Sequence, residues 1–210
     1  MKDIPVFTTE YGIASLSLQQ IPYREEAYVT LRTSDDPLKL AQECATFCRM
    51  CGAQRVFVTG HPQLEQLPLY TQVIRMRGSM KPGEEAFLWP VTADNAAQWR
   101  EIYNDKMKRV DNATVFSAMQ ERQLYEPSGA YFVHDGQKLL GIGWLREQEL
   151  LALASVVPGA GEKVLRTILS LAGEESVTLE VASTNGKAIS LYEKMGFVQT
   201  EVLRSWYCVN

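Results

Sequence analysis

Apolar and polar positions alternate with a period of two along several short stretches of the first third of the chain. Strands are predicted at 13–19, 26–33, 54–59 and 73–77. One helix is predicted from Pro37 to about Cys51, because Asp36 offers N-cap chemistry before a proline and Gly52 can end the helix. Residues 61–69 contain two prolines and predict at most a broken helix.

The remainder of the chain carries a clearer pattern. Strands are predicted at 87–91, 130–134, 139–145, 150–157, 177–182 and 198–208, the last as one or two strands. Helices are predicted at 94–110, 115–125, 162–172 and 185–195. Asp135-Gly136 between two strands is a strong hairpin signal, and the almost wholly apolar stretch 150–157 is typical of a strand buried on both faces. The pattern predicts an α/β protein with a mixed, mostly antiparallel sheet (α+β) and helices on both faces.

A segment rich in Gly, Pro, Ser and charge separates these two parts. It reads Gly-Ser-Met-Lys-Pro-Gly-Glu-Glu over residues 78–85, and no apolar periodicity crosses it. We therefore predict a small N-terminal α/β lobe at 1–78, a linker at 79–85 and a larger domain at 86–210.

Charge and length narrow the class of protein further. The chain has 210 residues and a formal net charge of −4, which argues against an electrostatic grip on nucleic acid or an anionic membrane. No apolar run approaches the roughly 20 residues that span a bilayer, and the N-terminal residues do not form a signal peptide. We expect a cytoplasmic protein, monomeric or homodimeric, without a nucleic-acid or membrane partner.

Residues 185–197 predict a helix with both ends marked. Thr184 or Asn185 can accept hydrogen bonds from the first free N–H groups. Gly196 stands where a left-handed residue closes a helix. Phe197 is then expected to fold back onto the side chains five or six positions before it.

This segment carries a resemblance to a known family. Its pattern, Asn-x-x-Ala-x-x-Leu-Tyr-x-Lys-x-Gly-Phe, follows a strand and precedes the last strands, and residues 86–210 as a whole resemble the GCN5-related N-acetyltransferases (GNAT family). The resemblance implies transfer of an acetyl group from acetyl-CoA to a primary amine of a small molecule or protein, by direct attack in a ternary complex and without a metal. The N-terminal lobe loosely resembles a degenerate half-copy of the same domain.

The turn before the helix at 162–172 is a second candidate site. A strand end, two glycines and a helix N-terminus occur together there, which suits a diphosphate. The family signature is Gln/Arg-x-x-Gly-x-Gly/Ala: Gly159 and Gly161 match its small positions, but Val156 stands where Gln or Arg is usual, and the turn is short. The resemblance assigns acetyl-CoA binding to Ser155, Val156, Val157, Gly159, Ala160, Gly161, Glu162, Lys163, Asn185, Ala188 and Tyr192.

The chemistry needs few side chains. In this family a tyrosine at the position of Tyr192 protonates the departing sulfur, and backbone N–H groups of the strand matching 153–157 meet the carbonyl oxygen. Glu149 and Glu180 are the candidates for a general base, although a solvated or structural carboxylate is the commoner role for each.

Two other functions remain open from the residues alone. The short turn and Val156 suit a non-catalytic acyl-CoA-binding regulatory protein. Cys44, Cys48 and Cys51 have the Cys-x3-Cys-x2-Cys spacing of radical S-adenosylmethionine enzymes, which hold an iron–sulfur cluster. The three cysteines also fall on one face of a predicted helix, so we expect them to pack in the core without a metal.

Overall fold

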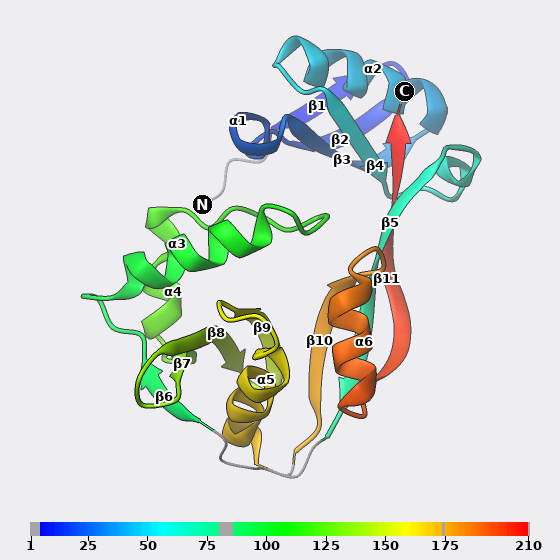
Figure 1. Cartoon of the computed structure of the whole chain (residues 1–210). Helices are drawn as coiled ribbons and strands as arrows, with labels where there is room; N and C mark the ends of the chain where they lie inside the picture. The colour runs from blue at the N-terminus through cyan, green and yellow to red at the C-terminus, as the bar shows by residue number, and fades with distance from the viewer. Residues whose placement is uncertain (1–4, 80–85, 174, 210) are drawn as a thin grey trace. The chain divides into compact units, whose positions relative to one another are not determined.

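The computed structural model describes residues 5–79, 86–173 and 175–209, which form two compact units (Figure 1). Unit 1 contains the described residues up to Val73 and from Val202 onward, and unit 2 contains Ile74–Glu201. This division differs from the predicted one, because it falls within two long strands, β5 (Leu69–Gly78) and β11 (Val198–Val209). The end of β11 pairs with strand β4 of unit 1, which no local pattern reveals. Most of the predicted linker, residues 80–85, lies outside the described residues.

Unit 1 is a mixed sheet with one long helix. Its strands are β1 (Val6–Thr9), β2 (Gly12–Ser17), β3 (Glu26–Ser34), β4 (Arg55–Thr59) and parts of β5 and β11. Its helices are α1 (Ile21–Arg24), α2 (Pro37–Met50) and the 3-10 helix η1 (Pro62–Gln66). The strand order β1-β2-β3-β4-β11 contains one parallel pair, β3 with β4, which α2 connects.

Helix α2 forms where its end signals predict it. The Asp36 carboxylate accepts the Lys39 N–H at 3.1 Å, and Gly52 has a φ of 99° just beyond the last turn. Its apolar face packs on the sheet, and Cys44 and Cys48 are fully buried there. The prediction for Cys51 was wrong: it lies past the helix end and is exposed. Strand β1 was missed because it is short and its side chains are exposed or half-buried, so it carries little apolar signal.

Unit 2 has a longer sheet with the order β11-β5-β10-β9-β8-β7-β6. Its strands are β6 (Phe87–Pro90), β7 (Ala130–His134), β8 (Leu139–Arg146), β9 (Glu149–Ser155), β10 (Val177–Ala182) and parts of β5 and β11. Its helices are α3 (Ala96–Met107), η2 (Ala118–Gln120), α4 (Arg122–Tyr125), α5 (Gly161–Leu169), η3 (Ser170–Ala172) and α6 (Gly186–Lys194).

Helices cover both faces of this sheet, as predicted. On one face, a Cβ on Gly143 would lie 2.4 Å from Cγ1 of Ile168, so the glycine lets α5 lie directly on β8. On the other face, Ile142 and Trp144 of the same strand join the apolar cluster around Trp99 of α3. The mixed α/β architecture with a mostly antiparallel sheet is therefore the observed fold class.

One predicted helix, at 115–125, is wrong. Only a turn of 3-10 helix and one turn of α4 form there. The Asn104 side chain of α3 accepts the Phe116 N–H at 2.7 Å and donates to the Phe116 carbonyl at 2.9 Å, which keeps Phe116 out of a helical ladder. Ser117 and Gln120 then form a capping box that starts the 3-10 turn.

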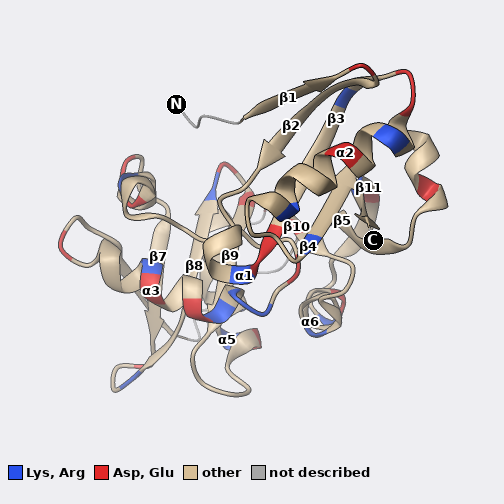
Figure 2. Ribbon diagram, turned by 90° about the horizontal axis from the view of Figure 1, so that it is seen from above, with Lys and Arg blue, Asp and Glu red and all other residues tan. Residues whose placement is uncertain are grey.

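The sheet strands also differ in detail from the apolar pattern. Strand β9 alternates between half-buried and buried positions, although its sequence predicted burial on both faces. The final segment forms a single strand, β11, which is one of the two predicted outcomes. Acidic and basic positions are interspersed along the elements of both units (Figure 2). In the part of the chain that the structure describes, no helix is long and apolar enough to cross a membrane.

Candidate functional site

Strands β9 and β10 of unit 2 are paired at one end only. Their parallel register joins Glu149 to Thr178 and Leu150 to Leu179, and it registers no pair beyond these two. Both strands continue, β9 to Ser155 and β10 to Ala182 (Figure 1). The later residues of β9 therefore lie on an edge that β10 leaves unpaired.

The unpaired edge of β9 presents backbone groups. The Val156 N–H, just after the strand, donates to the Leu140 carbonyl at 2.8 Å, so this amide points toward β8. Because backbone N–H groups alternate in direction along a strand, those of Leu153 and Ser155 point toward the β10 side. Two amides of the segment predicted to meet a carbonyl oxygen thus face the unpaired edge, and that of Val156 does not.

The turn after β9 leads directly into the N-terminus of α5. Gly159 has a φ of 80°, and a Cβ added to it would meet nothing within 4 Å, so this position is open and needs glycine for its backbone. The Ala160 N–H donates to the Val157 carbonyl at 3.2 Å, which closes the turn. No side chain caps α5, so the N–H groups of its first turn, from Gly161 to Lys163, stay available to an anion.

A carboxylate stands in this first turn and is neutralised. Glu162 lies 2.5 Å from the Lys194 ammonium of α6 and 3.0 Å from the Arg166 guanidinium. Hydrogen bonds from Lys194 and Arg166 hold the pKa of Glu162 below its usual value. The Lys194 contact was not predicted, although Lys194 belongs to the motif that marked α6. It joins the start of α5 to the end of α6.

Leu191 of α6 also reaches this turn. A Cβ on Gly161 would lie 3.4 Å from Cδ2 of Leu191, and the same Cβ would lie 4.0 Å from the Ser155 hydroxyl oxygen. Leu191 was not among the predicted site residues, although it directly precedes Tyr192. A methyl group at position 161 would make an ordinary van der Waals contact with Leu191, so helix α6 packs closely against the turn.

Helix α6 has both of the predicted ends. The Asn185 side chain accepts the Ala188 N–H at 3.3 Å, which caps the start. At the other end, Gly196 has a φ of 86° and its N–H donates to Glu193, while the Phe197 N–H donates to the Tyr192 carbonyl at 3.0 Å. These two bonds make a complete Schellman motif. The motif fixes the backbone of Tyr192 relative to the helix end.

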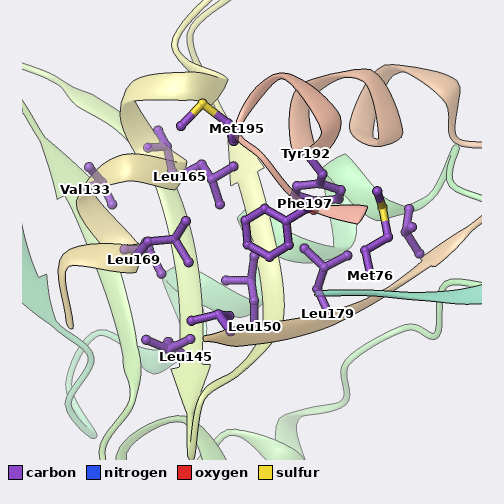
Figure 3. Packing of buried hydrophobic residues seen from close by; sticks show 14 of the residues in the cluster. Met76, Val133, Leu145, Leu150, Leu165, Leu169, Leu179, Tyr192, Met195 and Phe197 are labelled. Atoms are coloured by element: carbon purple, nitrogen blue, oxygen red, sulfur yellow. The ribbon is translucent and has the colours of Figure 1, made fainter. Parts of the chain in front are cut away.

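Tyr192 is held within the main apolar cluster of unit 2. Its ring centroid lies 6.0 Å from that of Phe197, which occupies the middle of the cluster near Leu165 and Leu150 (Figure 3). Burial raises the pKa of Tyr192 to about 12, so the phenol keeps its proton at neutral pH. Among the described residues, no side chain or backbone group forms a hydrogen bond with its hydroxyl. Within the part of the chain that the structure describes, the hydroxyl therefore has no structural partner and can donate its proton.

Three solved structures have a similar fold, and in each of them the matched region spans both units of this chain. A functionally unknown conserved protein from Staphylococcus epidermidis shares 11% identity at a TM-score of 0.57, with coverage of 99% of this chain and 94% of that one. A putative acetyltransferase from Pyrococcus horikoshii shares 12% sequence identity at a TM-score of 0.57, and the match covers 95% of this chain and 70% of that one. A GCN5-related N-acetyltransferase from Sphaerobacter thermophilus shares 13% sequence identity at a TM-score of 0.55, and the match covers 93% of this chain and 75% of that one.

The chain has the GNAT fold. Identities of this size establish the architecture and not the activity. The sequence itself matches no protein-family model and no curated protein. Since the matched region includes unit 1, the similarity extends beyond the residues 86–210 on which the sequence resemblance rests.

The two candidate bases lie at different places in this GNAT fold. Glu180 is half-exposed on β10 and lies 3.3 Å from the Arg75 guanidinium, which also binds Glu201. Glu149 begins β9 at the end where β9 and β10 are paired, six residues before Ser155. Neither carboxylate is brought to Tyr192 by a contact among the described residues.

The cysteines of unit 1 lie outside the elements that form this site. Burial raises the pKa of the Cys44 thiol to about 12 and that of Cys48 to about 11, which is the behaviour of thiols in apolar packing. The prediction of core packing is confirmed for these two. Over residues 5–79, 86–173 and 175–209, no group of three or more His, Cys, Asp or Glu side chains is placed to hold a metal ion.

Proposed function

We propose that this protein is an acyl-CoA-dependent N-acyltransferase that transfers an acetyl group from acetyl-CoA to a primary amine of a small molecule or a protein. The GNAT fold supports an acyltransferase in general terms. The observation that carries the proposal is the separation of β9 from β10 after two residue pairs, with an uncapped helix N-terminus and Tyr192 on the flanking helices. We propose that the reaction takes place in a ternary complex.

The unpaired edge of β9 suits the amide-containing arm of coenzyme A. Such an arm can pair with the Leu153 and Ser155 amides as a strand would. The first turn of α5 is suited to the diphosphate, with Gly159 leaving room for close approach and Lys163 adding positive charge. Asn185 and Ala188, at the start of α6, are proposed to contact the arm. Glu162 contributes backbone N–H only, because its carboxylate is bound by Lys194 and Arg166.

The proposed chemistry is direct attack. The neutral amine nitrogen bonds to the thioester carbonyl carbon, the carbon–sulfur bond breaks, and the sulfur receives a proton from the Tyr192 hydroxyl. A thiol pKa near 8.5 makes the unassisted thiolate a modest leaving group, so a positioned acid lowers the barrier. The carbonyl oxygen receives hydrogen bonds from the β9 edge as its negative charge grows. The proton lost by the amine passes to a base, for which Glu149 and Glu180 remain the proposed residues.

A binding measurement and a turnover measurement test this function separately. Acetyl-CoA at a hundred times its Kd stabilises a folded protein by about 2.7 kcal/mol, which a melting curve detects. Release of free thiol from acetyl-CoA in the presence of a panel of primary amines reports transfer. We expect both signals. Absence of any melting shift with millimolar acetyl-CoA and longer acyl-CoAs would show that the site does not bind the cofactor.

A non-catalytic acyl-CoA-binding role is the second candidate. Val156 offers an apolar side chain where the family usually has Gln or Arg, and the turn between β9 and α5 is short. Both features weaken the binding of acetyl-CoA. A melting shift with acetyl-CoA but no thiol release with any amine would favour this role.

A further inference from the structure

A hollow of about 470 Å³ lies in unit 1, at the end of the parallel strands β3 and β4. Its wall is formed by β3, the turn after β4, helix η1 and residues 203–205 and 207 of β11. Residues from Thr30 to Arg32 and Thr59 to Pro62 contribute, together with Leu203–Ser205 of β11. A volume of this size suits a small metabolite.

The hollow forms because strands β4 and β11 separate at Gly60. The antiparallel register of β11 with β4 joins Tyr207–Val209 to Val56–Val58 and registers no earlier pair. At Gly60 the chain turns away with a φ of 106°, and a Cβ there would lie 2.5 Å from the Leu31 carbonyl oxygen. Only glycine permits this turn so close to β3. Carboxyl ends of parallel strands with diverging connections are where open α/β sheets bind ligands.

The charged side chains that line the hollow are two arginines and one glutamate, so their net charge is positive. Arg32 and Arg204 are exposed to it, and Arg32 uses its Nε to bind the Ser15 hydroxyl, which leaves its terminal N–H groups for another partner. The His61 Nδ1 accepts the Gln63 N–H at 3.2 Å, so its proton in the neutral ring is on Nε2, which can donate. Glu65 is the one carboxylate among the lining residues.

Hydroxyl groups complete this lining. Thr59, at the end of β4, is only 5% exposed, and Thr30 and Ser205 line the same hollow. Ser205 accepts the Gln72 side-chain amide at 3.1 Å, which orients its own O–H for donation elsewhere. Two guanidinium groups, an imidazole N–H and several hydroxyls therefore border one small space.

We propose that this hollow binds a small molecule that carries a carboxylate or phosphate group. The planar guanidinium pairs with either oxyanion through two parallel hydrogen bonds. Glu65, of opposite charge, disfavours a ligand with several negative charges and can accept a donor from the rest of the molecule. This site is distinct from the elements of unit 2 that carry the proposed acyltransferase function, and it does not depend on that function.

Isothermal titration of the full chain tests the proposal, with inorganic phosphate, glycerol 3-phosphate and acetate as probes at constant ionic strength. At least one probe should bind saturably, and the carboxylate and phosphate arms tell which oxyanion the hollow prefers. Arg32→Gln and Arg204→Gln should each weaken that binding about tenfold or more, since each removes charged hydrogen bonds. Arg122→Gln is the matched control: it removes an exposed arginine of unit 2 that does not line the hollow.

Two results would overturn the proposal. One is the absence of saturable binding by every probe at millimolar concentrations. The other is an equal loss of binding in Arg122→Gln, which would indicate a general charge effect. The melting shift that acetyl-CoA produces should be the same in Arg32→Gln as in the parent. If no probe binds the hollow, the acyltransferase proposal still stands, and if acetyl-CoA does not bind, the proposal for the hollow still stands.

Discussion

Gly78 of β5 lies directly against Phe197, the residue that closes the Schellman motif of α6. A Cβ at position 78 would lie 2.8 Å from Cγ of the Phe197 ring and 2.9 Å from its Cα. Part of this contact is with backbone, so the ring cannot simply rotate away. Phe197 is 2% exposed and packs in the same cluster as Tyr192. The absence of a side chain at residue 78 thus permits the packing that holds the candidate catalytic helix.

Gly78→Ala should destabilise the protein. Forcing a methyl group into a packed site typically costs about 1–3 kcal/mol of unfolding free energy. Gly186→Ala is the control, because a Cβ there meets nothing within 4 Å and the residue begins a helix. Chemical denaturation of both variants beside the parent measures the difference. Equal stability of Gly78→Ala and the parent would mean that Phe197 can move without cost.

Tyr192→Phe should remove activity without removing the fold. The substitution keeps the ring and its packing, and the described residues give the hydroxyl no hydrogen bond to lose. Loss of the general acid should lower the chemical rate by roughly 10²–10⁴-fold. The measurement is turnover at saturating acetyl-CoA with the best amine, alongside melting curves. A variant that turns over like the parent at every pH would show that Tyr192 is not the acid.

The same variant should change the alkaline limit of stability. A pKa raised from near 10 in the unfolded chain to about 12 in the folded one means that the unfolded state loses its proton first as pH rises. The folded state therefore loses stability from pH 10 upward, by about 1.4 kcal/mol per pH unit until the folded pKa is reached. Below pH 10 there is no effect. Tyr192→Phe should lack this component, so its unfolding free energy should fall less steeply than that of the parent between pH 10 and 12.

Asn185 allows capping to be separated from cofactor binding. Asn185→Ala should cost about 1 kcal/mol of stability, because the Ala188 N–H loses its cap. Asn185→Ser restores a capping oxygen and should recover most of that stability. If Asn185 also contacts acetyl-CoA, the affinity should stay reduced in both variants, as measured by titration. Full recovery of affinity in Asn185→Ser would limit the residue to a capping role.

Neutralising Glu26 should lower the free energy of unfolding more than neutralising any other carboxylate of unit 1. It is fully buried, it accepts the Tyr28 hydroxyl at 2.8 Å, and it is bound by Arg24 at 3.0 Å and by Arg55. Glu26→Gln should destabilise by about 3–5 kcal/mol, since two guanidinium groups lose the charge they face. Glu201→Gln is the matched control, because Glu201 is half-exposed and also binds an arginine; it should cost at most about 1 kcal/mol. Denaturant melts compare them, and equal losses would contradict the role of burial.

Local rules made much of this structure predictable. The helix ends at Asp36, Asn185 and Gly196 depend on residues within four positions, and each formed as its sequence indicated. The turn at Gly159 likewise follows from a strand pattern that stops at glycines. By contrast, the helix predicted at 115–125 did not form, because Asn104, at least 11 positions away in sequence, holds Phe116 through two hydrogen bonds.

The sequence by itself determined the fold class, most element types and the helix that carries Tyr192, because capping and apolar period are local properties. Tertiary structure decided that β9 and β10 pair over two positions only, that Lys194 reaches Glu162, and that the end of β11 joins β4. Pairing of strands depends on which backbone edges meet after the whole chain has packed, and the local pattern of a single strand does not specify its partner. The unpaired edge of β9, on which the proposed function rests, is of this second kind.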